Sequence, residues 1–436
     1  MSRRLQCVGW RATRNCTADG FREPQNDKSC SEIITGEQSG YCEVEDIDSG
    51  ERFPVMRSDC NGQQRKTKSE APDFAGFRSN AHAVALKAQV SGFMLPNGAS
   101  NGQNPRDGIV MAVRPKLLPS AYAGIRVLRD VLKCHLPVEI WFHVDEVGFL
   151  SRVFAIYNSH FNRVLFLDVD NIPVRDPTFL FSSVEFEKNG AIFWPDFWHP
   201  QRTPFNLHAR SMVWELVDLP FVDMVEQESG QLLVDRTRHA APLELVYFYA
   251  FHEPNFFRKL DLVYGDKDLF RLAWMKLEAS FHMIETVPAM AGQVINGSFC
   301  GMTMVQHDVG GNVLFLHRNR HNLTSEQLEN SATEIAETGS IVILPPEPES
   351  GGELSNEYLD SIMSTHLMSF SKNASKESYL VDSYRAPPDF PKWQLCNGRR
   401  YNDNRGFFEL HEFSEQEFSG IELDLRHYAA EATKRQ

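Results

Sequence analysis

A short apolar run that ends in two aspartates constrains the fold more than any other stretch of this chain. Residues 164–168 are too few and too rich in β-prone side chains for a helix, so they predict a buried strand. Asp168 and Asp170 come at its carboxyl end, and Pro173 then turns the chain away. Ligands of an open α/β sheet bind at the carboxyl ends of its strands, so we expect both aspartates to line a crevice.

Two carboxylates this close repel each other, and a divalent cation relieves the repulsion most simply. Their oxygen atoms suit Mg²⁺ or Mn²⁺, which leave coordination positions for water and phosphate. We interpret the motif as a site for the diphosphate of a nucleotide sugar. A bare D-x-D often occurs by chance. The strand before it, the turn after it and the neighbouring acid-ended strand at 190–196 favour a metal site over a surface ion pair.

Strands and helices are expected to alternate ahead of this motif. Residues 108–113 and 138–143 predict strands, and residues 120–132 and 149–157 predict helices. This alternation predicts an α/β fold with a Rossmann-like sheet and βαβ crossovers. No G-x-G-x-x-G or G-K-S/T motif occurs there, so metal and positive side chains must hold the phosphates. Arg126 and Arg129 are donor-binding candidates, and ordinary solvated helix positions explain them equally well.

Charge and hydropathy argue against nucleic acids and membranes as direct binding partners. The 436 residues carry a formal net charge of −14, with a pI near 5.6, so nothing suggests binding to nucleic acid or to an anionic membrane. No run of 18 apolar residues is present, and the first residues lack the apolar core of a signal peptide. We therefore expect any membrane attachment to come only through an anchor that is not present in this chain.

Cysteines and sequons indicate the secretory pathway. Five of the eight cysteines lie in the first 60 residues, at spacings that favour disulfides over zinc. The odd fifth cysteine either pairs with a distant one or stays a thiol. The distant cysteines are Cys134, Cys300 and Cys396. N-x-S/T sequons occur at Asn15, Asn296, Asn322 and Asn373. We expect a lumenal or secreted protein.

Composition divides the chain into four parts. Residues 1–70 predict a small disulfide-stapled module, because so few apolar side chains build no core unaided. Residues 71–107 predict a linker around a short helix at 82–90. Residues 108–344 predict the α/β domain, and residues 345–436, which begin with a Pro- and Glu-rich break, predict a C-terminal extension.

Two segments in the second half carry further candidates. Ser229 and Gly230 predict a turn before an apolar strand; Gly230 would let the backbone approach a ligand, and Gln231 could reach a sugar hydroxyl. A plain strand-entry turn explains them equally well. Asp266 is expected at a helix N-cap with Asp268 in the first turn. Capping alone would account for both, and a carboxylate facing a sugar is the functional alternative.

A hairpin is predicted at residues 303–319, with Gly310 and Gly311 at its turn. Its second strand ends in His317 and Arg318. A histidine at a strand end is more often structural than a ligand. Beside a pair of aspartates that needs a third ligand, His317 is the leading candidate, and Arg318 could neutralise phosphate.

Six motifs together resemble the fungal-type α-mannosyltransferases of the Golgi. They are LPVEIWF (136–142), RVLFLDVDNIPVRDPTFLF (163–181), GAIFWPDFW (190–198), ESGQLLVD (228–235), GDKDLFRLAW (265–274) and VQHD…FLHRN (305–319). The resemblance implies a GT-A fold, GDP-mannose as donor, transfer with retention, and Mn²⁺ or Mg²⁺ held by Asp168 and Asp170. It also places His317 where related GT-A enzymes have a metal-binding histidine. Members normally carry an N-terminal membrane anchor.

The resemblance also suggests roles for the remaining candidates. Asp266, Asp268 and Gln231 are candidates for stabilising an oxocarbenium-like transition state. Ser229, Gly230, Arg126, Arg129 and Arg318 are candidates for binding the donor nucleotide sugar. Trp194, Asp196 and Trp198 are candidates for binding a glycan or glycoprotein acceptor, and core packing explains the tryptophans equally well. Two alternatives stay open: a GT-A transferase for UDP-glucose, UDP-galactose or UDP-xylose, and a non-catalytic glycan-binding protein on a transferase scaffold.

Overall fold

The computed structural model describes residues 4–60, 66–67, 70–97, 106–142, 150–205, 207–318, 364–386, 395–398 and 407–434. The chain forms two compact units and passes between them several times. The first contains Met1–Gly108, Val147–Phe166 and Phe181–Glu285; the second contains Ile109–Glu146, Leu167–Leu180 and Thr286–Gln436. The predicted domain boundary at residue 344, the Pro- and Glu-rich break and the sequon at Asn322 lie outside the described residues.

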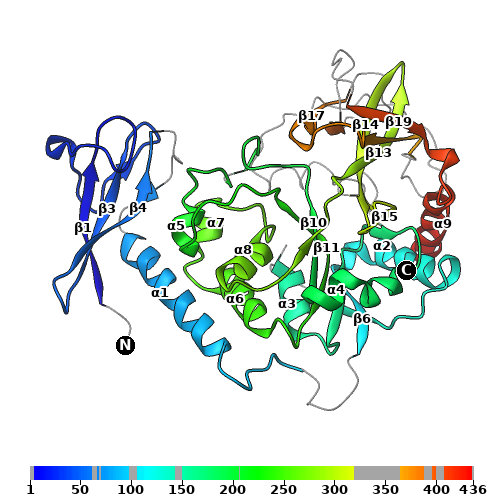
Figure 1. Cartoon of the computed structure of the whole chain (residues 1–436), viewed down its shortest axis with the longest axis horizontal. Helices are drawn as coiled ribbons and strands as arrows, with labels where there is room; N and C mark the ends of the chain where they lie inside the picture. Colours follow the sequence, from blue (N-terminus) through cyan, green and yellow to red (C-terminus); the bar gives the residue numbers. More distant parts are fainter. Residues whose placement is uncertain are drawn as a thin grey trace. The chain divides into compact units, whose positions relative to one another are not determined.

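The first unit begins with a small antiparallel sheet. Its strands β1 (Leu5–Ala12), β3 (Gly40–Asp46) and β4 (Arg52–Ser58) lie in the order β1-β3-β4 (Figure 1). Two disulfides, Cys7–Cys30 and Cys16–Cys60, cross-link this module. The short strands β2 (Ile33–Ile34) and β5 (Lys66–Thr67) also pair. The predicted disulfide-rich N-terminal module is therefore confirmed.

Helix α1 (Ala71–Ala88) follows this module and is longer than the helix predicted at 82–90. Phe74 and Phe77 are buried on it, with ring centroids 5.3 Å and 6.1 Å from that of Phe256. The prediction was wrong in extent because an Ala-rich segment has little amphipathic contrast. Its two phenylalanines are fixed by contacts far away in the sequence, which no local pattern reveals.

The first unit also contains four strands of an α/β sheet, in the order β12-β10-β11-β8. They are β8 (Arg163–Leu167), β10 (Ala191–Pro195), β11 (Gln227–Asp235) and β12 (His282–Met283). Strand β10 is parallel to β12 and antiparallel to β11, so the sheet is mixed. The helices of this unit after α1 are α3 (Ser151–Asn158), α4 (Val184–Asn189), α5 (Val213–Val217), α6 (Ala240–Phe251), α7 (Phe256–Lys259) and α8 (Leu269–Lys276).

The second unit contains a parallel strand pair and a larger antiparallel assembly. The pair is β6 (Asp107–Val113) and β7 (Val138–Phe142), linked through α2 (Leu118–Arg126). The antiparallel strands are β9 (Asn171–Pro173), β13 (Ala289–Ile295), β14 (Ser298–His307), β15 (Val313–His317), β16 (His366–Phe370), β17 (Asp382–Arg385), β18 (Leu395–Gly398) and β19 (Phe408–Glu412). Helix α9 (Ile421–Lys434) ends the described chain.

These elements confirm the predicted α/β class with a mixed sheet flanked by helices. The predicted hairpin is strands β14 and β15. The core of the second unit joins α9 to α2, β9 and β15 through residues such as Leu425, Ala123, Ile172 and Leu316. Among the described residues, no helix combines the length and the apolar character that crossing a membrane requires.

Candidate functional site

Strand pairing brings the third candidate metal ligand to the two aspartates. Strand β9, which starts at Asn171, pairs with β15 in a register that sets Asn171 opposite His317. His317 Nε2 consequently lies 3.4 Å from Asp170 Oδ1 and 3.9 Å from Asp168 Oδ2. One ligand atom from each of the three residues lies within 4.8 Å of the others. The register of one short strand pair therefore assembles the site from two segments 147 residues apart.

Hydrogen bonds hold the backbone of this aspartate loop. Ser120 Oγ on α2 donates to the carbonyl of Val169 at 2.9 Å, and the Arg318 N–H donates to the carbonyl of Asp170 at 2.9 Å. The Asn171 N–H closes the turn onto the carbonyl of Asp168 at 3.0 Å. The loop between the two aspartates is thus fixed from α2 and from β15, which orients both carboxylates.

The donor set fits a small hard cation. Two carboxylates and one imidazole supply oxygen and nitrogen ligands without sulfur, as Mg²⁺ and Mn²⁺ prefer. Asp168 and Asp170 are half-buried and His317 is buried, so the ligands are partly desolvated. Three protein ligands leave further positions of an octahedral ion for water or phosphate. Asp168, Asp170 and His317 are therefore a candidate metal centre.

Arg126 and Arg129, the two arginines predicted to bind the donor, both have hydrogen-bond partners within the protein. Arg126 donates to Asp130, Tyr122 and Glu431, and Arg129 donates to the carbonyls of residues 134 and 136 at 2.6 Å each. Arg126 lies on α2, and Arg129 lies in the wider π-turn that continues this helix over Val127–Val131. Their binding of a donor stays a prediction.

The predicted Ser-Gly turn is wrong, because Ser229 and Gly230 lie inside β11. The β10–β11 register jumps from Phe193↔Leu232 to Trp194↔Glu228, so residues 229–231 bulge out of the ladder. The Glu228 carboxylate caps this bulge by accepting from the N–H groups of residues 229 and 230, at 2.8 Å and 2.7 Å. Bulges of this kind commonly redirect side chains at functional sites. Gln231, in the bulge, is buried.

The predicted N-cap at Asp266 is also wrong. Helix α8 begins at Leu269, and its N-cap residue is Asp268, which has a φ of 66° and makes no side-chain capping bond. The Asp268 carboxylate instead binds Arg271 and accepts from the Gln227 N–H at 2.9 Å. Asp266 pairs with Arg152 at 3.0 Å. Tertiary partners, rather than the helix end, determine how both carboxylates point.

Asp196 and Glu226 complete a buried charge cluster around Lys267. Lys267 Nζ contacts Asp196 Oδ2 and lies 3.4 Å from Glu226 Oε2. Desolvation by burial raises the pKa of Asp196 to about 6 and that of Glu226 to about 7. Lys267 opposes both shifts, and nearby carboxylates add to them. One lysine therefore stabilises these acids only in part, and protonation competes with ionisation near neutral pH.

Sequence reasoning missed Arg152, Glu226, Glu228, Lys267 and Arg271 as members of this cluster. Lys267 lies between two chosen aspartates, and Glu226 and Glu228 lie next to the chosen bulge, so the motifs contained a signal. No local sequence pattern indicated Arg152, because its partner Asp266 lies 114 residues later in the chain.

The aromatic candidates differ in exposure. Trp194 is fully buried, and its neighbour in β10, Phe193, packs on Trp274 at 5.3 Å. Trp198 is partly exposed and meets the ring of Phe205 at 6.5 Å. The structure therefore allows Trp198 to reach a ligand more readily than Trp194, and acceptor binding stays a prediction for both.

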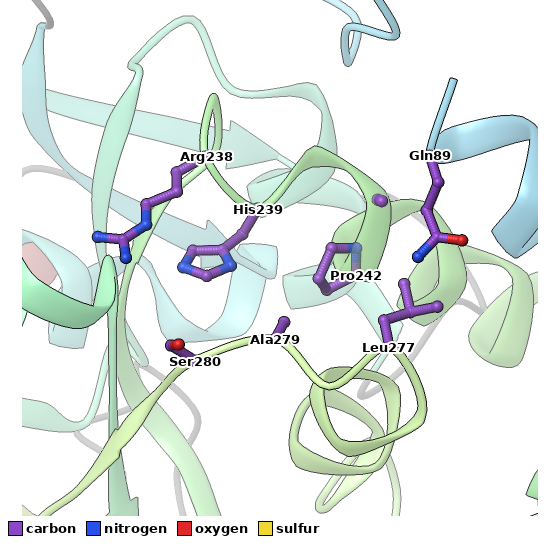
Figure 2. A pocket seen from close by; sticks show the side chains of 8 residues that line it. Gln89, Arg238, His239, Pro242, Leu277, Ala279 and Ser280 are labelled. Atoms are coloured by element: carbon purple, nitrogen blue, oxygen red, sulfur yellow. The ribbon is translucent and has the colours of Figure 1, made fainter. Parts of the chain in front are cut away.

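A small pocket of about 230 Å³ in the first unit contains none of the predicted site residues (Figure 2). Arg238 and His239 lie on one side of it, and Gln89 and Leu277 on the other. Arg238 donates to the carbonyls of residues 187 and 188, and His239 Nε2 lies 2.8 Å from that of Asn189. Burial lowers the pKa of His239, so its ring is neutral at neutral pH. These side chains therefore bind the last carbonyl groups of α4.

Two aspartates follow strand β8, and β15 brings a histidine to them. This arrangement is typical of α/β proteins that bind a divalent cation at the end of a strand. Residues 141–215 and 221–308 match the mannosyltransferase family Mannosyl_trans3. The predicted resemblance to fungal α-mannosyltransferases is thereby confirmed for this central region. His317 and Arg318 lie just beyond the match.

The curated relatives of this chain are named as α-1,2-mannosyltransferases. The α-1,2-mannosyltransferase MNN2 of Saccharomyces cerevisiae is 28% identical over 196 residues, which cover 37% of this chain and 33% of that protein. The α-1,2-mannosyltransferase MNN21 of Candida albicans is 24% identical over 312 residues, covering 53% of this chain and 47% of that protein. The chain thus spans about a third to a half of the length of these relatives.

Solved structures with a local likeness include two glycosyltransferases. The bifunctional glycosyltransferase WbbM has a TM-score of 0.30 and 11% identity, over 45% of this chain and 41% of that one. The galactosyltransferase LgtC has a TM-score of 0.27 and 12% identity, over 41% and 72%.

Proposed function

We propose that this protein is a metal-dependent α-mannosyltransferase that transfers mannose from GDP-mannose to a glycan acceptor with retention of configuration. The observation that carries the proposal is the convergence of Asp168, Asp170 and His317 in a chain whose central region matches mannosyltransferases. A nucleotide sugar has a diphosphate that such a centre can bind. The matched relatives are named as α-1,2-mannosyltransferases, which makes mannose the first choice of sugar.

Asp168, Asp170 and His317 would hold Mn²⁺ or Mg²⁺, which supplies Lewis-acid neutralisation of the charge that develops on the leaving diphosphate. The chain itself orients the three ligands, because Ser120 and Arg318 fix the backbone of the aspartate loop. We assign Arg318 a further role as a cation for the diphosphate, since the planar fork of a guanidinium matches the geometry of a phosphate.

On the sugar side, Gln231, Asp266 and Asp268 stay our candidates for groups that stabilise positive charge on the anomeric carbon. Gln231 is an uncharged amide in the β11 bulge, and Asp266 is oriented by Arg152. Retention is tested by following the anomeric configuration of the first product with NMR during the initial turnovers. An inverted first product would contradict this part of the proposal.

Asp196 and Trp198 are proposed to contact the glycan acceptor, with Trp198 supplying a partly exposed ring. The described disulfides, two in the N-terminal module and Cys300–Cys396 in the second unit, support an oxidising compartment. We therefore propose that the enzyme works in the Golgi lumen on glycoprotein glycans.

The test is a thermal-shift panel with GDP, UDP, GDP-mannose and UDP-sugars, each with MnCl₂ and with EDTA. A ligand that binds the native state raises the melting temperature by mass action. We expect GDP and GDP-mannose to stabilise the protein only with Mn²⁺. Stabilisation by UDP compounds instead would keep the transferase and change the donor. No shift with any nucleotide would favour a non-catalytic glycan-binding protein.

Substitutions of the proposed metal ligands test whether the thermal shifts arise from binding at this site. Asp168→Ala and Asp170→Ala should each abolish the Mn²⁺-dependent shift and Mn²⁺-dependent turnover. Asp176→Ala is the matched control, because this aspartate lies in the same segment but accepts from the N–H of Thr178 at 3.0 Å. Wild-type-like turnover in Asp170→Ala would show that the metal assignment is wrong.

A further inference from the structure

Glu422, on the C-terminal helix, holds two residues that are far apart in the sequence. Its Oε1 lies 3.4 Å from Arg318 Nη1, and its carboxylate accepts from Ser364 N at 2.7 Å and Ser364 Oγ at 3.1 Å. One carboxylate therefore contacts both the arginine that follows His317 and the backbone at Ser364.

The pair is buried and its helix is anchored. The side chains of Arg318 and Glu422 are 5% and 2% exposed. Next to Glu422, Ile421 and Leu425 are buried in the same core cluster as Ile172 and Leu316. Ile172 follows the aspartate loop, and Leu316 directly precedes His317. Packing of α9 thus sets where the Glu422 carboxylate can lie relative to the strands that carry the metal ligands.

Arg318 is the residue through which this anchoring reaches the metal centre. Its N–H donates to the carbonyl of Asp170, and it directly follows His317. A buried arginine loses conformational freedom and hydration when a carboxylate fixes its planar fork, and a fixed fork binds a phosphate at a lower entropic cost. Release of the carboxylate would free the guanidinium to adopt other orientations.

We infer that Glu422 is a positioning residue, which orients Arg318 for a nucleoside diphosphate bound at the Asp168–Asp170–His317 centre. Helix α9 and Ser364, which lie outside the region that matches the mannosyltransferase family, are then working parts of the donor site. The inference rests on the proposed function, because it takes the ligand to be a nucleoside diphosphate. It goes beyond that function by naming the element that prepares the phosphate cation.

The test compares Glu422→Gln with Asp424→Asn in the full chain. Asp424 lies two residues further along the same helix and is half-buried, so its change removes a carboxylate from α9 and leaves the Arg318–Glu422 pair in place. Isothermal titration gives the Kd of MnCl₂ alone and the Kd of GDP at saturating MnCl₂. We expect Glu422→Gln to raise the Kd of GDP about tenfold, as for other residues that orient a ligand's contacts. The Kd of Mn²⁺ should change less than about twofold, and Asp424→Asn should change neither.

A double-mutant cycle separates positioning from stability. If Glu422 acts through Arg318, Glu422→Gln should have no effect on GDP affinity in an Arg318→Met background. An equal loss of affinity in both backgrounds, or no loss in either, would overturn the inference. Should Glu422→Gln fold poorly, the double variant R318M/E422M replaces the pair with apolar side chains, which buried ion pairs often tolerate.

This double variant should fold and bind GDP as weakly as Arg318→Met alone. Binding of GDP as tight as in the wild type would overturn the role given to Arg318 and Glu422. If the wild-type protein binds neither GDP nor UDP in the presence of MnCl₂, the proposed function itself fails. That result is distinguishable, because it concerns the unmutated chain.

Discussion

Replacing Glu226 with glutamine should remove much of the dependence of stability on pH between pH 5 and pH 8. Glu226 is 1% exposed, and its pKa is raised to about 7 from an ordinary value of 4.5, chiefly by burial and then by Asp268. Its folded-state pKa lies above the unfolded one. The folded state therefore has its full stability below about pH 4.5, and loses stability as the pH rises through 7.

The magnitude follows from the shift. The difference between about 7 and 4.5, at about 1.4 kcal/mol for each pH unit, gives a loss of up to about 3.5 kcal/mol in the free energy of unfolding. Lys267, 3.4 Å from Glu226 Oε2, already reduces this loss. A glutamine side chain has nearly the same shape as glutamate and no charge to desolvate, so the variant should be as stable as the wild type at pH 5 and more stable at pH 8.

The assay is urea denaturation of the wild type and Glu226→Gln at pH 5, 6, 7 and 8, followed by tryptophan fluorescence. Glu278→Gln serves as the control, because that carboxylate is exposed. Asp196, whose pKa is raised to about 6, should leave a smaller residual slope in the variant. Parallel slopes for the wild type and Glu226→Gln would refute the argument that burial of this carboxylate opposes its ionisation.

Three further outcomes are expected. Glu215→Ala should destabilise the contact of the N-terminal module with α5 by about 2 kcal/mol, measured by hydrogen exchange in β4, because this carboxylate accepts from the N–H groups of Met56 and Arg57 at 2.9 Å each. Unchanged exchange in β4 would contradict it. Replacing Cys300 and Cys396 by alanine should cost about 2–5 kcal/mol in denaturation, since the disulfide links residues 96 apart; equal stability of the reduced wild type and the oxidised wild type would argue against this. Burial lowers the pKa of His307 to about 4, below its unfolded value of about 6.5, so the fold should lose up to about 3.5 kcal/mol as the pH falls from 6.5 to 4. His307→Gln should flatten this acid limb in urea denaturation, and a limb of the same slope in the variant would mean that another group is responsible.

The sequence was sufficient for features that depend on local patterns. The apolar run before Asp168 predicted β8, and the Gly-Gly turn predicted the hairpin that ends in His317. Asp168, Asp170 and His317 were proposed as ligands, and the structure brings them together. Each inference needed only the character of a strand and the chemistry of the residues at its end.

Features that depend on pairing across the chain were not accessible. The bulge at Gly230 arises from the β10–β11 register, whereas its residues alone resemble a turn. Asp266 was expected to cap a helix, but Arg152 and Ser229 hold it instead. No local sequence pattern indicated a role for Glu422, since its partner Arg318 lies 104 residues earlier in the chain.

The two groups of acidic residues stabilise their charges in different ways. In the second unit, two aspartates and a histidine converge, a pattern that a divalent ion satisfies. In the first unit, five carboxylates lie among three cations, and burial raises the pKa of at least two of the acids. The carboxylates are Asp196, Glu226, Glu228, Asp266 and Asp268; the cations are Arg152, Lys267 and Arg271.

The raised pKa values of Asp196 and Glu226, together with the cation of Lys267, therefore relieve part of the repulsion among the acids of the first unit. Among the described residues, the only His/Cys/Asp/Glu group with metal-ligand geometry is the one at Asp168, Asp170 and His317. A cluster whose acids titrate near neutral pH can lower its charge by taking up a proton and ionise when a positive charge develops beside it. In a transferase of the proposed kind, such carboxylates would stabilise positive charge that develops on the sugar.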